Sequence, residues 1–220
     1  MTGLSKALIF LFAAAALFFS VFPEMDLRFS SFFYHPATRF YMADAPVCRW
    51  FYQSVEIITF AWVTLAVLWL GRIWILKKTS RSLSAAQVIY LLMVLAIGPG
   101  LIVNVVLKDH WGRARPNDIA AFGGTSTFTP AFMISDECRS NCSFVSGHAA
   151  MGFYFIAFGF VFRRHRSLLT ILAVIYGSIS GLVRIVQGGH FLSDVVFAFF
   201  IVYAVSAVLY GIMFERKFPA

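Results

Sequence analysis

Long runs of apolar residues recur along this chain, and they limit its fold more than any other feature. A helix needs about 20 apolar residues to cross the hydrocarbon core of a bilayer, whereas the core of a soluble domain needs no run of that length. The chain has 220 residues, of which 60% are hydrophobic and only 13% charged. That apolar share exceeds the usual value for soluble domains. The sequence therefore predicts an all-α polytopic membrane protein.

We expect six transmembrane helices in a single domain that covers residues 1–220. Residues 98–100 (G-P-G) predict a kink inside the third span, because proline cannot donate to the helical ladder. Phe29, Phe32 and Phe33 recur at helical spacing between the first two spans and predict a short interfacial helix there. The predicted spans are Leu4–Phe22, Val55–Leu76, Ala85–Leu107, Ser146–Phe162, Leu168–Val183 and Phe191–Met213.

Charge divides unevenly between the two sides of this topology. The side with both termini carries only Glu215 of the ten acidic residues, yet ten of the eighteen basic ones. The positive-inside rule places that side in the cytoplasm, and the opposite side in the periplasm of a bacterium. Topology thus accounts for the net charge of +8, and we expect no nucleic-acid partner. The ten basic residues are Lys6, Arg72, Lys77, Lys78, Arg81, Arg163, Arg164, Arg166, Arg216 and Lys217.

Residues 184–194 (R-I-V-Q-G-G-H-F-L-S-D) place ionisable groups between two apolar runs, where such groups are costly. His190 and Asp194 are four residues apart and would share one face of a helix. A carboxylate there could hydrogen-bond one ring nitrogen and leave the other free to react. The glycine pair at 188–189 predicts a tight turn that returns Arg184 to the histidine. A polar break satisfied by headgroups and water is the alternative for this stretch alone.

Three cations crowd the outer end of the third span, in the segment K-D-H-W-G-R-A-R-P. These cations, Lys108, Arg113 and Arg115, lie on the acid-rich side, so the positive-inside rule does not explain them. Guanidinium forks and a lysine point charge suit a phosphate group with several oxygens. Anchoring to lipid headgroups is the alternative.

A third polar segment, S-G-H, opens the fourth span. Ser146 is a candidate N-cap, Gly147 lets a ligand approach the backbone, and His148 lies in the first helical turn. The predicted topology brings all three polar segments to one membrane face. Together, these cations, histidines and the aspartate indicate phosphoryl transfer, a reaction that would require no metal or cofactor here. A metal site formed by His148, His190 and Asp194 is the alternative.

These segments resemble the type 2 phosphatidic acid phosphatase superfamily, whose pattern is K-x6-R-P, then P-S-G-H, then S-R-x5-H-x3-D. The match covers residues 108–194. Val145 stands where the family usually has proline, and Val183 replaces the usual serine. These departures remove one backbone constraint and one hydroxyl that could bind phosphate.

The resemblance implies a role for each matching residue. His190 would be the nucleophile and form a phosphohistidine, with Asp194 as its orienting partner. His148 would protonate the leaving oxygen and then activate water. No role is implied for His110 or Arg113. The phosphate would be held by Lys108, Arg115, Ser146, Gly147 and Arg184.

The implied activity is hydrolysis of a phosphate monoester or diphosphate on a membrane lipid, at the periplasmic face of a bacterial inner membrane. The segments H-W-G-R-A-R-P, F-G-G and F-T-P are similar to those of lipid A phosphatases, so lipid A is the expected substrate. Undecaprenyl diphosphate and phosphatidylglycerophosphate are alternatives. Vanadium haloperoxidases share this scaffold but are soluble. An anion or lipid transporter is an alternative of another class, although transporters usually bind at the bilayer midplane.

Two cysteines bracket a short polar turn, E-C-R-S-N-C, in the long loop after the third span. Cys138 and Cys142 could form a disulfide if this loop is extracytoplasmic. Two free thiols are the alternative. The sequence does not indicate an oligomeric state.

Overall fold

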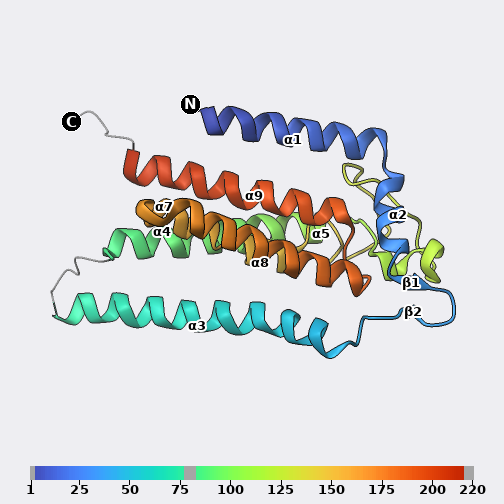
Figure 1. The fold of residues 1–220 in the computed structure, drawn as a ribbon, viewed down its shortest axis with the longest axis horizontal. Coiled ribbons are helices and arrows are strands. Elements are labelled where there is room, and N and C mark those ends of the chain that lie inside the picture. The colour runs from blue at the N-terminus through green and yellow to red at the C-terminus, as the bar shows by residue number, and fades with distance from the viewer. Residues whose placement is uncertain (1–2, 77–82, 216–220) are drawn as a thin grey trace.

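The computed structural model describes residues 3–76 and 83–215, and it is almost entirely helical. Its long helices lie along one axis, with both chain ends at the same end of the bundle (Figure 1). Five of the basic residues used to predict topology lie outside the described ranges: Lys77, Lys78, Arg81, Arg216 and Lys217. The longer helices are α1 (Gly3–Val21), α2 (Glu24–Ser31), α3 (Pro46–Leu76), α4 (Ala85–Leu95), α6 (Gly147–Phe153), α7 (Ile156–Val161), α8 (Arg166–Val186) and α9 (Leu192–Tyr210).

Several short elements complete the chain. Strands β1 (Tyr34–His35) and β2 (Arg39–Phe40) form an antiparallel hairpin in which Tyr34 pairs with Phe40. The remaining elements are the π-helices η1 (Ala96–Leu107) and η5 (Gly211–Glu215), the helical turn α5 (Lys108–His110), and the 3₁₀ turns η2 (Pro116–Asp118), η3 (Ala120–Phe122) and η4 (Arg163–His165).

Within the described ranges, four helices are long and apolar enough to cross a membrane. A fifth candidate is formed if Lys6–Val21 and Glu24–Ser31 are counted as one span, although these two helices meet at an angle of 84°. The prediction of a helical chain with several apolar membrane helices is therefore confirmed, but the predicted number of six is not. The four are Pro46–Leu76, Ala85–His110, Arg163–Val186 and Leu192–Glu215.

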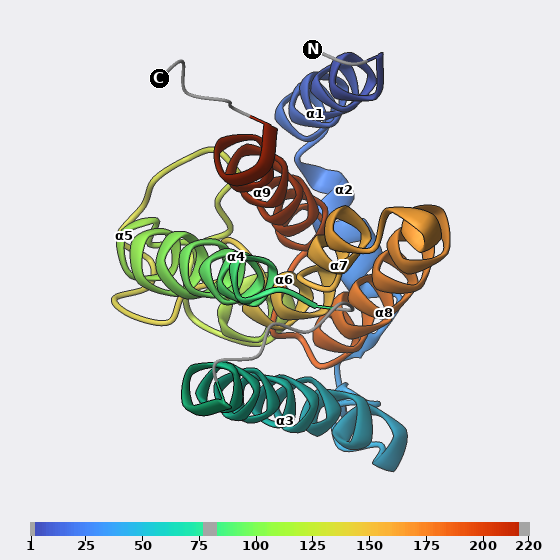
Figure 2. The same ribbon diagram turned by 90° about the vertical axis from the view of Figure 1, so that its left-hand side faces the viewer.

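The predicted fourth span consists of two short helices, α6 and α7, which lie inside a ring formed by α3, α4, α8 and α9 (Figure 2). Its first helix is rich in small residues, including Gly147, Ala149, Ala150 and Gly152. A Cβ atom added to Gly152 would lie 2.7 Å from the Cα atom of Gly177 on α8. Small residues therefore allow the two helices to pack backbone against backbone, as is common in membrane bundles.

Residues 98–100, where the sequence predicts a kink, lie in a stretch of π-helix. The α-helical pattern of α4 ends at Leu95, and η1 continues as a π-helix through Pro99 to Leu107. A proline removes one backbone donor, and a wider helical turn is one way to accommodate that loss. The whole stretch from Ala85 to His110 is still continuous enough to count as one apolar helix that could cross a membrane.

Two predicted boundaries move in ways that affect the site. Helix α3 begins at Pro46, nine residues before the predicted start of the second span, because proline at the first helical position costs no hydrogen bond. Helix α8 continues to Val186, so Arg184 lies in its last turn and not after it.

The aromatic residues before α3 predict a short helix, and α2 is present in that segment. Phe32 is 72% exposed, but Phe29 and Phe33 pack against the main apolar core. On the polar side of α2, Asp26 and Ser30 are buried. The helix therefore turns these polar side chains towards the protein.

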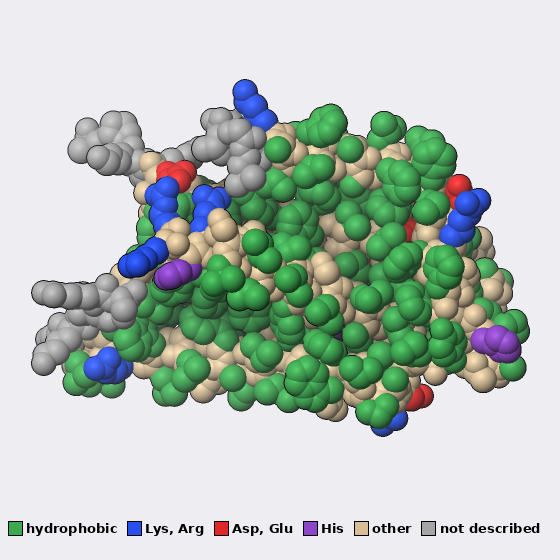
Figure 3. Space-filling view, in the orientation of Figure 1, with side chains coloured by type: hydrophobic (Ala, Val, Ile, Leu, Met, Phe, Trp, Pro, Cys, Tyr) green, Lys and Arg blue, Asp and Glu red, His purple; other side chains and the backbone are tan. Residues whose placement is uncertain are grey.

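Apolar side chains cover the middle of the bundle, and charged side chains lie near its two ends (Figure 3). On the face shown, Lys and Arg gather mostly at the end that holds the chain termini. This pattern is typical of a membrane protein with its termini on the basic side.

Candidate active site

The three polar segments meet at the end of the bundle opposite the chain termini, beside α2 and the β1–β2 hairpin (Figure 1). Lys108 follows η1, His148 lies in the first turn of α6, and Arg184 lies in the last turn of α8. His190 lies between α8 and α9, and Asp194 is in the first turn of α9. The convergence expected from the alternating direction of the spans is therefore present.

The turn predicted at residues 188–189 is confirmed. Gly188 has φ +67, a conformation that favours glycine, and the Gly189 N–H donates to the Arg184 carbonyl at 2.9 Å. A Cβ atom on Gly189 would lie 2.3 Å from Nη2 of Arg184. The glycines therefore let the guanidinium fold back against the turn that carries His190.

His190 is almost fully buried, with 1% of its surface exposed. Its Nδ1 atom lies 2.7 Å from the carbonyl oxygen of Ser143. A carbonyl oxygen can only accept a hydrogen bond, so Nδ1 must carry the proton. In a neutral ring the lone pair then lies on Nε2, which is the arrangement that a histidine nucleophile requires.

The direct hydrogen bond predicted between Asp194 and His190 is absent, because the Asp194 Oδ2 atom lies 3.6 Å from Nδ1. Asp194 instead accepts hydrogen bonds from the Ser143 hydroxyl and, at 2.8 Å, from the Phe191 N–H. Helix α9 begins only at Leu192, so the predicted helical face does not extend back to His190. Asp194 therefore acts on the ring through Ser143, whose hydroxyl it binds and whose carbonyl contacts Nδ1.

Burial lowers the pKa of His190 to about 4, against the opposing effect of the nearby Asp194 carboxylate. Between its ordinary value of 6.5 and pH 4, the unfolded chain binds a proton that the folded chain excludes. The stability contributed by the neutral ring is thus complete above pH 6.5 and is lost as the pH falls towards 4. As the pH falls from 6.5 to 4, we expect the melting temperature of the wild type to fall more than that of His190→Gln. A difference that stays constant with pH would contradict the depressed pKa.

Arg113 does not lie with the other two cations of its segment. Its side chain is fully buried, and its Nη1 and Nη2 atoms pair with Asp194 at 2.6 Å and with Asp26 at 2.8 Å. Residues 112–115 lack helical structure, and successive side chains of an extended segment point to opposite sides. Arg115 therefore faces the site with Lys108, and Arg113 faces the interior. Of the three cations in this segment, Arg113 is thus the one that pairs with carboxylates in the interior.

The S-G-H segment adopts the predicted helix start. Ser146 is the N-cap of α6, and its hydroxyl oxygen accepts from the Ala149 N–H at 3.4 Å. A Cβ atom on Gly147 would lie 2.7 Å from Oδ1 of Asn104 and 3.3 Å from Nζ of Lys108. The absence of a side chain at this position therefore lets the Lys108 ammonium approach the helix start.

Two residues of α3, Tyr52 and Glu56, also contact the site, although neither belongs to the three motifs. The ring of Tyr52 stacks on His148 with 4.1 Å between centroids, and the guanidinium carbon of Arg184 lies 5.0 Å from the same ring. The Glu56 carboxylate lies 3.7 Å from Nε2 of His148. Tyr52 and Glu56 are four residues apart on α3, and an acidic residue inside an apolar helix is itself a functional signal.

Two buried nitrogens of the site, His148 Nε2 and Arg184 Nε, have no hydrogen-bond partner among the described residues. Buried polar groups are normally paired, and unpaired ones often mark a functional position. The Arg184 Nε–H is a donor that suits a phosphate oxygen, and so is His148 Nε2 when it carries the proton. Together with Lys108 and Arg115, they offer the kind of donors that an anion with several oxygens requires.

Metal ligation has no comparable support. Across residues 3–76 and 83–215, no group of three or more His, Cys, Asp or Glu side chains has the geometry to hold a metal ion. The candidate metal ligands are also otherwise engaged, since Asp194 is bound by Arg113, Ser143 and Phe191.

Comparison with known proteins gives a consistent result. The lipid A 4′-phosphatase of Francisella tularensis subsp. novicida (strain U112) is 38% identical over 209 residues, which cover 92% of each chain. The lipid A 4′-phosphatase of Rhizobium leguminosarum is 45% identical over 103 residues, or 46% of this chain and 44% of that one. No solved structure matches. The model of the PAP2 superfamily matches residues 87–218, more than half of the chain, so this protein belongs to the PAP2 superfamily.

Proposed function

We propose that this protein is a lipid A 4′-phosphatase, a phosphoric monoester hydrolase of the membrane. The observation that carries the proposal is the cluster of Lys108, Arg115, Arg184 and His148 beside a neutral, buried His190. The choice of lipid A rests on the relative from Francisella, which matches over 92% of both chains.

The proposed reaction has two steps. In the first, the Nε2 lone pair of His190 attacks phosphorus, the phosphorus–oxygen bond to the lipid breaks, and His148 donates a proton to the leaving oxygen. In the second, His148 takes a proton from water, and the hydroxide oxygen displaces His190 to release phosphate. Two histidines with different surroundings suit this division of labour, because one must stay neutral and the other must exchange a proton.

The remaining residues would bind the phosphate oxygens. Lys108, Arg115 and Arg184 supply positive charge where charge develops in the transition state. The Ser146 hydroxyl and the Gly147 amide add neutral donors at the start of α6. We infer that Tyr52 keeps His148 and Arg184 in place, since its ring contacts both.

We also propose one domain with six membrane crossings, of which α6–α7 is the fourth, and α2 at the membrane interface. The termini would lie in the cytoplasm and the site in the periplasm of a bacterial inner membrane. A disulfide between Cys138 and Cys142 at the site end supports this orientation, because disulfides persist in oxidising compartments. After reduction, a membrane-impermeant maleimide should label Cys138 in intact spheroplasts. Labelling only after permeabilisation would reverse the orientation.

Mass spectrometry of lipids before and after incubation with the purified protein tests the substrate. We expect lipid A to lose one phosphate, from the 4′ position by fragmentation, and to do so in the presence of EDTA. Undecaprenyl diphosphate and phosphatidylglycerophosphate serve as competing substrates. Release from either of these lipids with none from lipid A would overturn the substrate assignment while leaving the phosphatase chemistry intact.

A further inference from the structure

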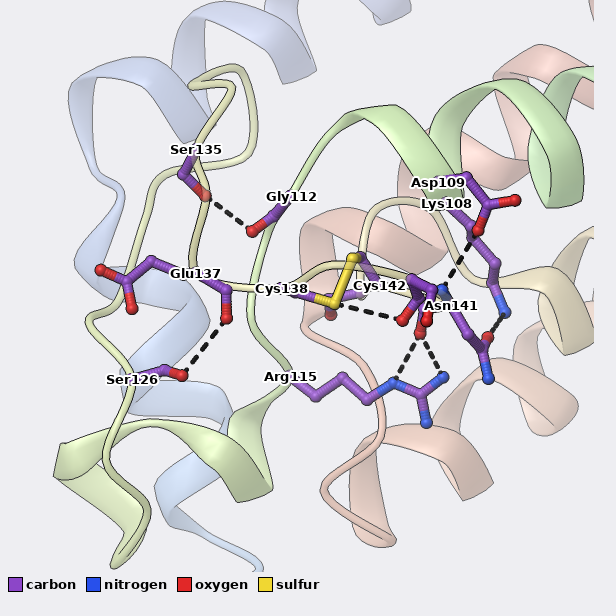
Figure 4. Close-up of a disulfide and its surroundings, with 12 residues drawn as sticks. Lys108, Asp109, Gly112, Arg115, Ser126, Ser135, Glu137, Cys138, Asn141 and Cys142 are labelled. Carbon is purple, nitrogen blue, oxygen red and sulfur yellow. Dashed lines mark hydrogen bonds between the residues drawn. A yellow bond between two sulfur atoms is a disulfide. The ribbon is translucent and has the colours of Figure 1, made fainter.

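A five-residue loop closed by the disulfide between Cys138 and Cys142 lies directly against the first motif (Figure 4). Its residue Asn141 has φ +50, in the left-handed region that asparagine tolerates better than most residues. Figure 4 shows Lys108 and Arg115, which come from either end of that motif, both directed at Asn141.

Asn141 contacts each of these cations through a different oxygen. Its backbone carbonyl accepts from Nε and Nη2 of Arg115, at 3.1 and 2.6 Å. Its side-chain Oδ1 accepts from Nζ of Lys108 at 3.0 Å. Both cations are therefore held by one residue, although they are seven positions apart in the sequence.

The loop is itself fixed to the same segment at two further points. The Asn141 N–H donates to the Asp109 carboxylate at 3.2 Å, and the Cys142 N–H donates to the Lys108 carbonyl at 3.0 Å. Cys142 is fully buried, whereas Asn141 is exposed. The disulfide thus links an exposed turn to a buried anchor and limits the positions that Asn141 can take.

The chemistry of the contact suits a site that receives an anion. Two like charges held close together repel each other, and an acceptor between them offsets that repulsion. A carboxylate would do so more strongly but would also repel a phosphate, whereas the oxygens of Asn141 are neutral. Lys108 keeps two of its three N–H donors, and Arg115 keeps Nη1, for a ligand.

We propose that Asn141 is a positioning residue, which aims Lys108 and Arg115 at the substrate phosphate, and that the Cys138–Cys142 disulfide holds it in place. This inference rests on the proposed phosphatase function and extends it to a residue outside the three motifs. It makes phosphate binding depend on the oxidation state of the loop.

The first test replaces Asn141 with glycine, which readily adopts the left-handed backbone and removes the side chain whose Oδ1 accepts from Lys108. We expect KM for lipid A in mixed micelles to rise about tenfold, the effect of losing one hydrogen bond to a charged group. The concentration of orthovanadate that halves activity should rise in parallel. Loss of folded protein would lower the apparent kcat but leave KM unchanged, so this readout separates positioning from destabilisation. Ser140→Ala is the matched control, because Ser140 is the exposed neighbour of Asn141 in the same loop, whereas Lys108 and Arg115 are bound by Asn141.

The second test acts on the folded wild type. Reduction with a phosphine should raise KM severalfold, and reoxidation should restore it. The Cys138→Ser/Cys142→Ser variant should show the raised KM and no response to reductant, whereas Cys48→Ser, which alters a buried free thiol, should respond as the wild type does.

The outcomes distinguish this inference from the function on which it rests. An oxidised wild type that releases phosphate, with KM unchanged in Asn141→Gly and after reduction, would overturn the positioning role alone. An oxidised wild type without activity on any lipid phosphate would instead remove the proposed function.

Discussion

Replacing His190 with alanine should reduce phosphate release by about ten-thousand-fold or more, the scale seen when a covalent nucleophile is removed. The imidazole is fully enclosed, and its Nδ1 proton is committed to the Ser143 carbonyl, so only Nε2 can attack. The other histidine of the site, His148, is not placed to replace it, because it lies on another helix with its ring held against Tyr52. Initial rates with lipid A in mixed micelles measure the effect.

His110→Ala provides the matched control for this variant. His110 lies in α5, close to the motif, but its ring is exposed and its Nδ1 atom lies 2.9 Å from the Val106 carbonyl within the same helical segment. We expect its rate to stay within about twofold of the wild type, as for most surface substitutions. Equal losses in the two variants would point to general damage and not to a nucleophile.

A trapping experiment separates the two histidines by role. With an aryl phosphate whose leaving group needs no proton, His148→Asn should still transfer phosphate to His190 but hydrolyse the intermediate slowly. Acid-labile, base-stable phosphoprotein should therefore accumulate in His148→Asn and be absent in His190→Ala. Substantial phosphoprotein in His190→Ala would show that another residue is the nucleophile.

The sequence predicted the elements of this site well because motif spacing and helix direction are local properties. Lys108, His148 and His190 each follow or precede an apolar run, and alternate runs must return to the same membrane face. The glycine turn before His190 was predictable for a similar reason, since only a few residues adopt its backbone conformation.

Contacts between distant segments were not predictable in this way. Asp26 and Arg113 are 87 positions apart, and nothing local to either residue indicates that they pair. Tyr52 lies before Val55, the predicted start of the second span, although α3 already begins at Pro46. The choice of Ser143 over Asp194 as the partner of Nδ1 likewise depends on how the long loop packs, which periodicity does not encode.

The buried ion cluster around Arg113 leads to the second large prediction. Arg113, Asp26 and Asp194 are each at most 1% exposed. The Ser193 hydroxyl accepts from Arg113 at 2.9 Å and donates to Asp26, while the Thr129 carbonyl accepts from Arg113 Nε at 2.8 Å. One guanidinium therefore serves two carboxylates, and its carbon lies 4.3 Å from the centre of the Phe191 ring.

Arg113→Met should destabilise the fold by about 3–5 kcal/mol, since it leaves two buried carboxylates without a cation. In detergent micelles this corresponds to a melting temperature lower by roughly 10 °C for a chain of this size. Asp26→Asn should cost less, because Arg113 then keeps Asp194. The exposed pair Arg49–Asp44, at 4.0 Å with side chains 63% and 94% exposed, is the control, and Arg49→Met should change stability by less than about 1 kcal/mol.

A double-mutant cycle shows whether the cluster acts as a unit. Asp26→Asn should cost much less in the Arg113→Met background than in the wild type, because the contact it removes is already lost and one unpaired charge is relieved. The loss of Arg113 should also lower activity. Arg113 holds Asp194, and Asp194 holds the Ser143 hydroxyl. The Ser143 carbonyl in turn orients the His190 ring. The folded fraction of Arg113→Met should therefore show a lower kcat than the wild type. Additive melting shifts together with an unchanged kcat would mean that α2 and the nucleophile are not coupled through Arg113.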